Sequence, residues 1–236
     1  MPSPNEQRSP EPTLVGALSL PGSHGLSSIP SPAFVSHQFS NAATIAANME
    51  EHYATLTDMM MLLMKDVDRS GEELKKHETE DERAFWARAH TRAVFVAIEG
   101  ACECFRMQAF IAEANKIHQQ VSLGKLSVLA GETYFVTDEG EIRAQNLRMP
   151  LLAGLLLSLN SYAEAQGANH RAKKGHQWQR VRAAVKVRDR ITHPKNLKSL
   201  EITKVEIEDI DFTLKWFLNE VAAILREKGC DLPPLA

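Results

Sequence analysis

The sequence predicts an all-α helical bundle with a small inserted β-hairpin and a disordered N-terminal tail. Apolar residues recur at helical spacing over most of the chain after residue 80. The period changes between residues 121 and 145, where Asp138-Glu139-Gly140 separates two short segments typical of strands. Proline, serine and glycine dominate residues 1–36. The composition, 44% hydrophobic and 24% charged, argues against disorder of the whole chain.

The predicted tail covers residues 1–36. Its seven prolines are Pro2, Pro4, Pro10, Pro12, Pro21, Pro30 and Pro32. Such a segment cannot bury enough apolar surface to offset the entropy lost on ordering. We interpret it as a solvated tail, although the apolar segment from Leu14 to Leu18 can dock on a partner.

A first helix and a linker are predicted for residues 37–79. The helix runs from Asn41 to about Asp66, and its apolar run from Met59 to Met64 indicates either core packing or a dimer surface. The segment from Arg69 to Asp81 is charged and contains Ser70-Gly71, so a linker or a frayed turn is expected there.

Residues 80–229 form the predicted main domain, and residues 230–236 a short C-terminal tail. The longest helical pattern, from Glu82 to about His118, is apolar on several sides and is therefore expected at the centre of the bundle. Three more helices are predicted, over residues 150–165, 176–191 and 204–228; Pro150 opens the first and Gly229 ends the last.

Glu99 lies on the apolar surface of the long central helix. A buried carboxylate is costly without a partner. One interpretation is a structural ion pair, for which Arg92 and Arg106 are candidates because each lies seven residues away. The other is that Glu99 reaches Arg188 or His193 on a neighbouring helix and holds it in place.

Arg188 and His193 are the strongest candidates for chemistry. Pro194 disfavours helix at the residue before it, so the helix that carries Arg188 is expected to end near Ile191. In a continuous helix the two side chains would be separated by roughly 140° around the axis. A break after Ile191 lets the imidazole turn back toward the guanidinium.

The two side chains suit the cleavage of a phosphodiester. A guanidinium binds phosphate through a planar set of donors, and an imidazole exchanges protons near neutral pH. Together they make a plausible site for RNA cleavage that needs no metal ion. The alternative is an ordinary basic helix end, in which Arg188 binds the last carbonyls and His193 is solvated.

The segment from Arg188 to His193 resembles the Rx4–6H motif of HEPN domains, with Asp189 at the polar position after the arginine. The segment Arg190-Ile191-Thr192-His193-Pro194-Lys195 resembles the corresponding sequence in a set of small stand-alone bacterial HEPN proteins. Residues 92–100 resemble the early core helix of that set, and residues 215–217 its last helix. The resemblance covers roughly residues 80–225.

This resemblance implies a metal-independent endoribonuclease, acting as a homodimer, in a toxin, antiviral or RNA-processing setting. Arg188 would bind the scissile phosphate, His193 would be the acid and base, and Asp189 would orient its neighbours. Glu99, Arg190 and Thr192 would be supporting positions. No cofactor is expected. The implied partners are RNA, a second copy and an antitoxin or another protein; other HEPN domains have lost activity and only bind.

Positive charge is concentrated around the Arg/His pair. Between His170 and Lys198 the sequence contains one acidic residue, Asp189, and ten basic residues: Arg171, Lys173, Lys174, Arg180, Arg182, Lys186, Arg188, Arg190, Lys195 and Lys198. Because the net charge of the chain is −3, any attraction to nucleic acid must be local. This distribution favours a groove for phosphates, with Arg180, Arg182, Lys186, Lys195 and Lys198 as RNA-binding candidates. A solvated basic face is the alternative.

Other functional classes have little support. The sequence contains no glycine-rich phosphate loop, no nucleophile elbow and no zinc-ligand spacing. Its odd number of cysteines (Cys102, Cys104 and Cys230) and the absence of an apolar run long enough to span a bilayer indicate reduced thiols in a cytoplasmic protein. The functions that stay open are an endoribonuclease, a non-catalytic RNA-binding or protein-docking module, and a helical scaffold.

Overall fold

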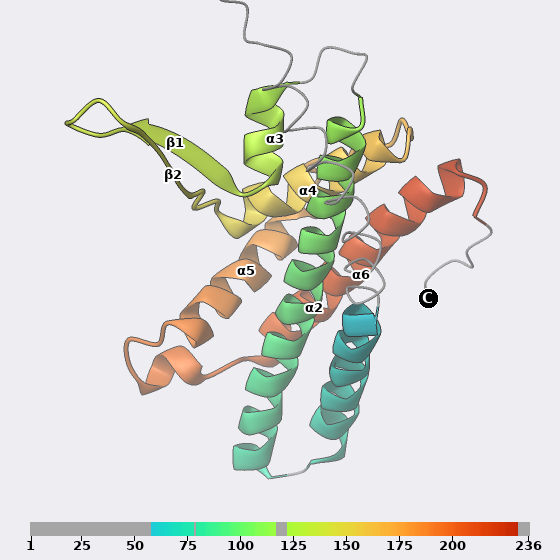
Figure 1. Cartoon of the computed structure of the whole chain (residues 1–236). Helices are drawn as coiled ribbons and strands as arrows, with labels where there is room; N and C mark the ends of the chain where they lie inside the picture. Colours follow the sequence, from blue (N-terminus) through green and yellow to red (C-terminus); the bar gives the residue numbers. More distant parts are fainter. Residues whose placement is uncertain (1–57, 78, 117–121, 231–236) are drawn as a thin grey trace, which may run out of the picture. The chain divides into compact units, whose positions relative to one another are not determined.

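A computed structural model describes residues 58–77, 79–116 and 122–230. The described residues are mostly helical and include one small antiparallel hairpin, so the predicted fold class is confirmed (Figure 1). The predicted tail, the part of the first helix before residue 58, and residues 231–236 lie outside the described residues.

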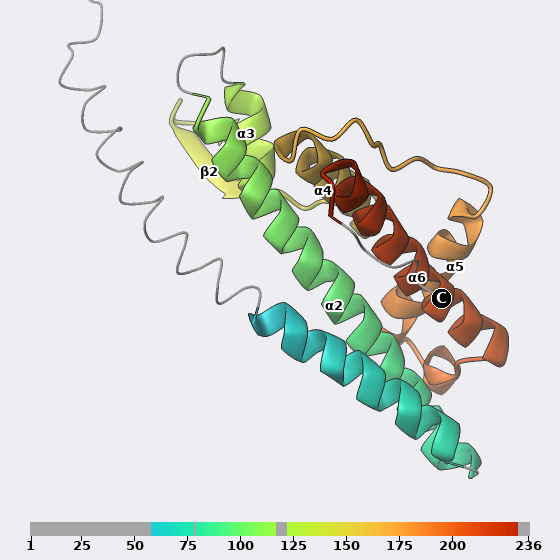
Figure 2. The same cartoon turned by 90° about the vertical axis from the view of Figure 1, so that its right-hand side faces the viewer.

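The helix α2 (Glu80–Ala114) contacts most of the other described helices. A helix at residues 58–76 lies alongside α2 in both views (Figures 1 and 2). α2 packs against several later elements, and α5 and α6 pack against each other. In chain order these elements are α3 (Leu123–Leu129), β1 (Glu132–Val136), β2 (Ile142–Asn146), α4 (Leu151–Ala165), α5 (Trp178–Thr192), the 3-10 helix η1 (Leu197–Leu200) and α6 (Lys204–Glu227).

The helix ends follow from local sequence. The Thr79 side chain accepts a hydrogen bond from the backbone of Glu82 at the start of α2. At the start of α6, Thr203 and Glu206 form a reciprocal capping box. Gly229 follows the end of α6 with a φ of 80°, a left-handed conformation that glycine adopts without strain.

The core lies where α2, α4, α5 and α6 meet. Its largest fully buried side chains are Phe95, Ile98, Leu155, Leu159, Ile191, Ile210 and Ile224. Around them Phe105 stacks on Tyr162, with ring centroids 4.2 Å apart, and on Phe217, at 6.1 Å. These ring contacts join α2, which carries Glu99, to α4 and α6.

The segment from Arg69 to Asp81 was expected to be a linker or a frayed turn, but it is helical to residue 76 and helical again from Glu80. Ser70 is buried, and its hydroxyl donates a hydrogen bond to the Val67 carbonyl at 2.9 Å. The hydroxyl therefore finds its hydrogen-bond acceptor within its own helix. Gly71 packs against the His90 side chain of α2. A Cβ at position 71 would lie only 3.3 Å from the imidazole Cε1, so a glycine suits this close contact. The two small residues therefore mark a helix contact, not a break.

The segment between α2 and α4 contains more helix than the sequence predicted. α2 ends at Ala114, and the short helix α3, which the sequence analysis missed, begins after the capping residue Ser122. The hairpin itself is confirmed: β1 pairs with β2 from Glu132↔Asn146 to Val136↔Ile142. Its placement between helices is as expected.

The three cysteines are unpaired. Cys102 and Cys104 are buried in α2, and burial raises the pKa of the Cys102 thiol to about 12, whereas Cys230 is exposed. No helix in the described part of the chain combines the length and apolarity needed to cross a bilayer. Residues 58–77, 79–116 and 122–230 contain no cluster of three or more side chains suited to holding a metal ion.

Glu113 joins three helices and makes folding sensitive to acid. Its buried carboxylate lies 2.9 Å from the Lys116 ammonium and 3.0 Å from that of Lys125 on α3, which also pairs with Glu164 on α4. Hydrogen bonds from Lys116 and then Lys125 lower the pKa of Glu113 to about 2. The resulting stabilisation is complete above the ordinary carboxyl pKa and is lost as the pH falls through about 2.

We therefore expect Glu113→Gln to lower the free energy of unfolding at pH 7 by about 0.5–1 kcal/mol, the upper range for partly exposed pairs. The difference in stability between pH 7 and pH 3 should be smaller in the variant than in the wild type. Urea denaturation at both pH values measures this. An unchanged pH dependence would contradict the role assigned to Glu113.

Candidate functional site: an arginine cleft and a basic helix face

Arg188 lies on the inward side of α5. Val181 and Val185, seven and three residues earlier, are buried on the same side. The guanidinium is correspondingly only a quarter exposed. Its Nη2 lies 2.6 Å from Oε1 of Glu99 on α2, and its Nη1 lies 3.0 Å from Oδ1 of Asp189. Arg188 is thus held between two carboxylates.

The contact between Glu99 and Arg188 confirms the expectation that Glu99 reaches the neighbouring helix. The further expectation that Glu99 is buried was wrong, because its side chain is 38% exposed. Arg106 pairs with Glu103 on its own helix, and Arg92 is exposed. The inter-helix interpretation of Glu99 is therefore the one that the geometry supports.

An open cleft of about 410 Å³ adjoins this ion pair. Its walls come from α2, α5 and the start of α4: Glu99, Met149, Pro150, Leu151, Leu152, Val185, Arg188 and Asp189. The first turn of α4 has no side-chain cap. Backbone N–H groups at a helix start favour negative charge. The guanidinium and this helix start therefore line the same small space as the carboxylates of Glu99 and Asp189, so an anion can bind there only by displacing a carboxylate from Arg188.

His193 ends α5 and is exposed to solvent. Its backbone N–H donates to the carbonyl of Asp189 at 3.0 Å, and the Thr192 hydroxyl donates to the carbonyl of Arg188 at 2.7 Å. The chain stays helical through Thr192, one residue further than predicted, and leaves the helix at His193 with φ −125° and ψ 64°. Within the described residues no hydrogen bond or ion pair links the His193 imidazole to Arg188.

Two of the candidate cations have structural partners. Arg180 pairs with Asp209 of α6 at 2.6 Å and lies over the Phe212 ring at 4.2 Å. Arg190 donates to the Glu201 carbonyl at 2.6 Å and pairs with Glu206 at 3.0 Å. Both arginines bind α5 to α6 and the segment before it.

The other candidate cations, Arg182, Lys186, Lys195 and Lys198, are exposed. Arg182 and Lys186 are four residues apart, so they lie on one face of α5, and Asp189 continues that face because it is seven residues from Arg182. Lys195 lies just after α5, and Lys198 is in η1. The predicted basic surface is therefore narrower than the sequence suggests: of the five RNA-binding candidates, Arg180 is exposed but paired with Asp209, and only Arg182 and the three lysines make no ion pair within the described residues.

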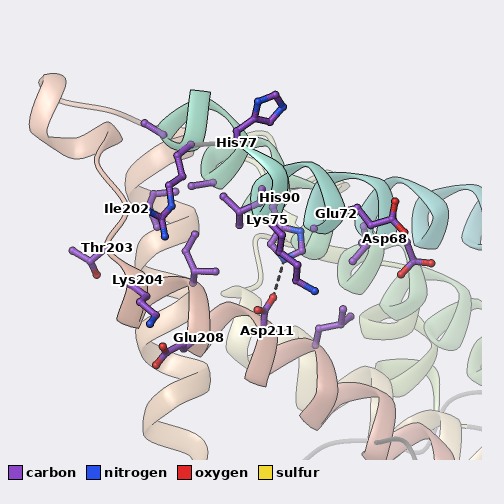
Figure 3. Close-up of a pocket in the computed structure, with 18 of the residues that line it drawn as sticks. Asp68, Glu72, Lys75, His77, His90, Ile202, Thr203, Lys204, Glu208 and Asp211 are labelled. Carbon is purple, nitrogen blue, oxygen red and sulfur yellow. Dashed lines mark hydrogen bonds and ion pairs between the residues drawn. The ribbon is translucent and has the colours of Figure 1, made fainter. Parts of the chain in front are cut away.

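A second polar array was missed by the sequence analysis. His90 of α2 is buried, with Nδ1 3.1 Å from the Ser70 hydroxyl and Nε2 2.8 Å from Oδ1 of Asp211 on α6. His90 and Asp211 are among the residues that line a groove of about 1760 Å³ between the first helix, α2 and α6. Figure 3 shows the hydrogen bond between them. The three residues are distant in sequence, and only Ser70-Gly71 hinted at a close contact there.

A hydrogen-bonded series of serine, histidine and aspartate also forms the catalytic triad of many acyl-transfer enzymes. Here the serine hydroxyl is buried, donates to the Val67 carbonyl and does not line the groove. A nucleophile must reach its substrate. The array instead connects three helices, with both ring nitrogens of His90 engaged.

Comparison of the chain with protein-family models, with curated proteins and with solved structures finds no match. The resemblance to HEPN domains therefore rests on the residues quoted above.

The two histidines His90 and His193 should differ sharply in their contribution to stability. We expect His90→Ala to lower the free energy of unfolding by about 2–4 kcal/mol, because it removes a buried side chain with two hydrogen bonds. His193→Ala should change it by no more than about 0.5 kcal/mol, because that side chain is exposed. Urea denaturation of both variants measures the difference. Equal losses would contradict the assignment of His90 as a structural residue.

Proposed function

We propose that the chain is an endoribonuclease of HEPN type that cleaves RNA with Arg188 and His193. The proposal is carried by one observation: Arg188 faces an open cleft, five residues before an exposed His193, at the end of a helix with exposed cations. A toxin or antiviral setting with an antitoxin or other protein partner, which the resemblance implies, belongs to the same proposal.

The RNA backbone binds along the outer face of α5. Arg182 and Lys186 are exposed on that face, and Lys195 and Lys198 extend it beyond the helix end. Cations in such a row neutralise successive phosphates and release condensed counterions. The described residues offer no row of exposed aromatic side chains along α5 for base stacking, so the binding is governed by the phosphate backbone.

Arg188 supplies the charge that the reaction needs. As a phosphate enters the cleft, it replaces Asp189 or Glu99 on the guanidinium, and both carboxylates are exposed enough to turn outward, at 56% and 38%. The guanidinium then binds two phosphate oxygens in a bidentate manner. It stabilises the negative charge that grows on the phosphoryl group in the transition state.

His193 handles the proton. The neutral imidazole removes the proton of the 2′-hydroxyl, whose oxygen attacks the adjacent phosphorus; a proton is then given to the departing 5′-oxygen. The bond from phosphorus to the 5′-oxygen breaks. The products are a 2′,3′-cyclic phosphate and a 5′-hydroxyl. The last turn of α5 lets the histidine move, because its backbone has already left the helix.

A non-catalytic module that binds RNA or a protein is the second candidate. It is favoured by the two carboxylates on Arg188, which neutralise the guanidinium. It is also favoured because no hydrogen bond or ion pair links Arg188 to the His193 imidazole within the described residues. In that case the basic face of α5 would act alone.

His193→Ala separates the two candidates. In the first, cleavage of a labelled single-stranded RNA should slow at least about 100-fold, because proton transfer loses its group. Binding of the same RNA should change by less than about twofold, because the imidazole is not one of the phosphate-binding cations. Gel-resolved cleavage in the presence of EDTA and filter binding measure both quantities.

His176→Ala is the matched control, since His176 is also an exposed histidine near α5. It should retain cleavage. If the wild type binds RNA but gives no 2′,3′-cyclic product, the non-catalytic candidate is correct. If His193→Ala cleaves as fast as the wild type, the assigned chemistry is wrong.

The basic face has its own test. We expect Arg182→Ala with Lys186→Ala to lower the slope of log binding constant against log salt concentration by about 1.4, since each phosphate contact on a single strand contributes about 0.7. The control is Lys65→Ala with Arg69→Ala, an exposed pair at the same spacing on the first helix. Fluorescence anisotropy at several salt concentrations measures the slopes. Equal effects of both pairs would refute a specific surface on α5.

A further inference from the structure

The cleft beside Arg188 has an apolar lining that phosphate binding does not use. Its apolar residues are Met149, Leu151 and Leu152, at or just before the start of α4, and Val185 of α5. Aliphatic side chains offer no hydrogen bond to a phosphate, whereas a nucleobase that leaves its stack packs its faces against apolar or aromatic side chains. The volume of about 410 Å³ falls within the usual range for a small-molecule site. The cleft therefore fits a base as well as its phosphate.

Glu99 loses its partner when a phosphate takes the guanidinium. Its Oε1 lies 2.6 Å from Nη2 of Arg188, and a bidentate phosphate needs that donor. Glu99 belongs to α2 and is 38% exposed, whereas Asp189, which is 56% exposed, continues the outer face of α5. Glu99 is thus the less solvated of the two carboxylates. Because a carboxylate beside apolar surface is costly without donors, donors on the bound nucleotide are favoured there.

Only one of the four RNA bases presents two adjacent donors to a carboxylate. The Watson–Crick edge of guanine places N1–H beside the 2-amino group, and these two N–H bonds match the two oxygens of a carboxylate. Adenine and cytosine place an amino donor beside a ring nitrogen that accepts, and uracil has a single N–H between two carbonyls. An acceptor opposite a carboxylate oxygen brings a lone pair against a negative charge. The chemistry of Glu99 therefore selects guanine.

We propose that Glu99 reads a guanine base in this cleft. The base belongs to the nucleotide whose 3′-phosphate binds Arg188, so cleavage occurs after guanosine. That guanosine must be unpaired, because its Watson–Crick edge is in use. The exposed cations of α5 bind RNA of any sequence, and selection takes place at the cleft. The cleavage step rests on the function proposed above, whereas the recognition of the base rests on the cleft alone.

Cleavage of four chimeric oligonucleotides tests the preference. Each is a single-stranded DNA with one central ribonucleotide, so that only one 2′-hydroxyl can attack. We expect cleavage at guanosine to be at least about tenfold faster than at adenosine, cytidine or uridine, because the bidentate pair is lost with the other bases. Inosine, which keeps N1–H and lacks the 2-amino group, should fall between guanosine and adenosine.

Glu99→Gln should reverse the preference. Glutamine presents one donor and one acceptor, which match the amino group and N1 of adenine and not the two donors of guanine. The ratio of the guanosine rate to the adenosine rate should fall at least about tenfold, and a ratio is insensitive to a general change in rate. Asp189→Asn removes the other carboxylate from Arg188 and should leave the ratio unchanged, whatever its effect on the rates. Glu103→Gln, the same substitution one turn along α2 and outside the cleft, is the second control.

Calorimetric titration with the 3′-monophosphates of the four nucleosides separates recognition from cleavage. Guanosine 3′-monophosphate should bind at least about tenfold more tightly than the other three. Equal affinities together with equal cleavage rates would overturn the guanine assignment and leave the nuclease proposal standing. Selective binding without cleavage of any chimera would refute the nuclease and retain the recognition, whereas neither selective binding nor cleavage would overturn both. A guanosine preference that survives Glu99→Gln would also overturn the role given to Glu99.

Discussion

The long helix α2 is apolar on several sides, and a helix of that kind is stable only when other elements surround it. This constraint places the first helix, α4 and α6 against it and brings α5 within reach of its middle (Figures 1 and 2). Polar contacts then form where α2 presents a polar group to a neighbour: His90 toward Ser70 and Asp211, Glu99 toward Arg188, and Glu113 toward two lysines. Each of these depends on the apolar packing that precedes it.

The features that the sequence predicted well are those with a local cause. Pro194 ends α5 close to the expected residue, and the turn at Asp138 predicts the hairpin. The contact of Glu99 with Arg188 was predicted from the cost of a buried, unpaired carboxylate. The pairing is present, although the carboxylate is 38% exposed and the premise of burial was wrong. Local sequence patterns thus predicted most of the fold, and the expected pairing of a charged group predicted one contact of the site.

The features that were missed depend on contacts between distant segments. Ser70-Gly71 resembles a helix break in isolation, because both residues have modest helix propensity. The tertiary contact with His90 outweighs this preference, and no local pattern announces a partner 121 residues away such as Asp211. The number of cations in the basic run likewise overstated how many are available to bind phosphate. Arg180 and Arg190 contribute to the basic run, yet their guanidinium groups bind α6 and the segment before it, which only the packing of α5 reveals.

The charges around Arg188 define what the candidate site must do to bind an anion. One guanidinium between two carboxylates, Glu99 and Asp189, gives the cleft a formal charge of −1, so it repels a phosphate at a distance. Attraction must therefore come first from Arg182, Lys186 and the lysines beyond α5, which act over about 8–10 Å at moderate salt. Only a phosphate already held nearby can compete for the guanidinium, because its local concentration is then high. The basic face and the arginine cleft are thus successive parts of one binding process, and the carboxylates restrict Arg188 to anions that the basic face has already bound.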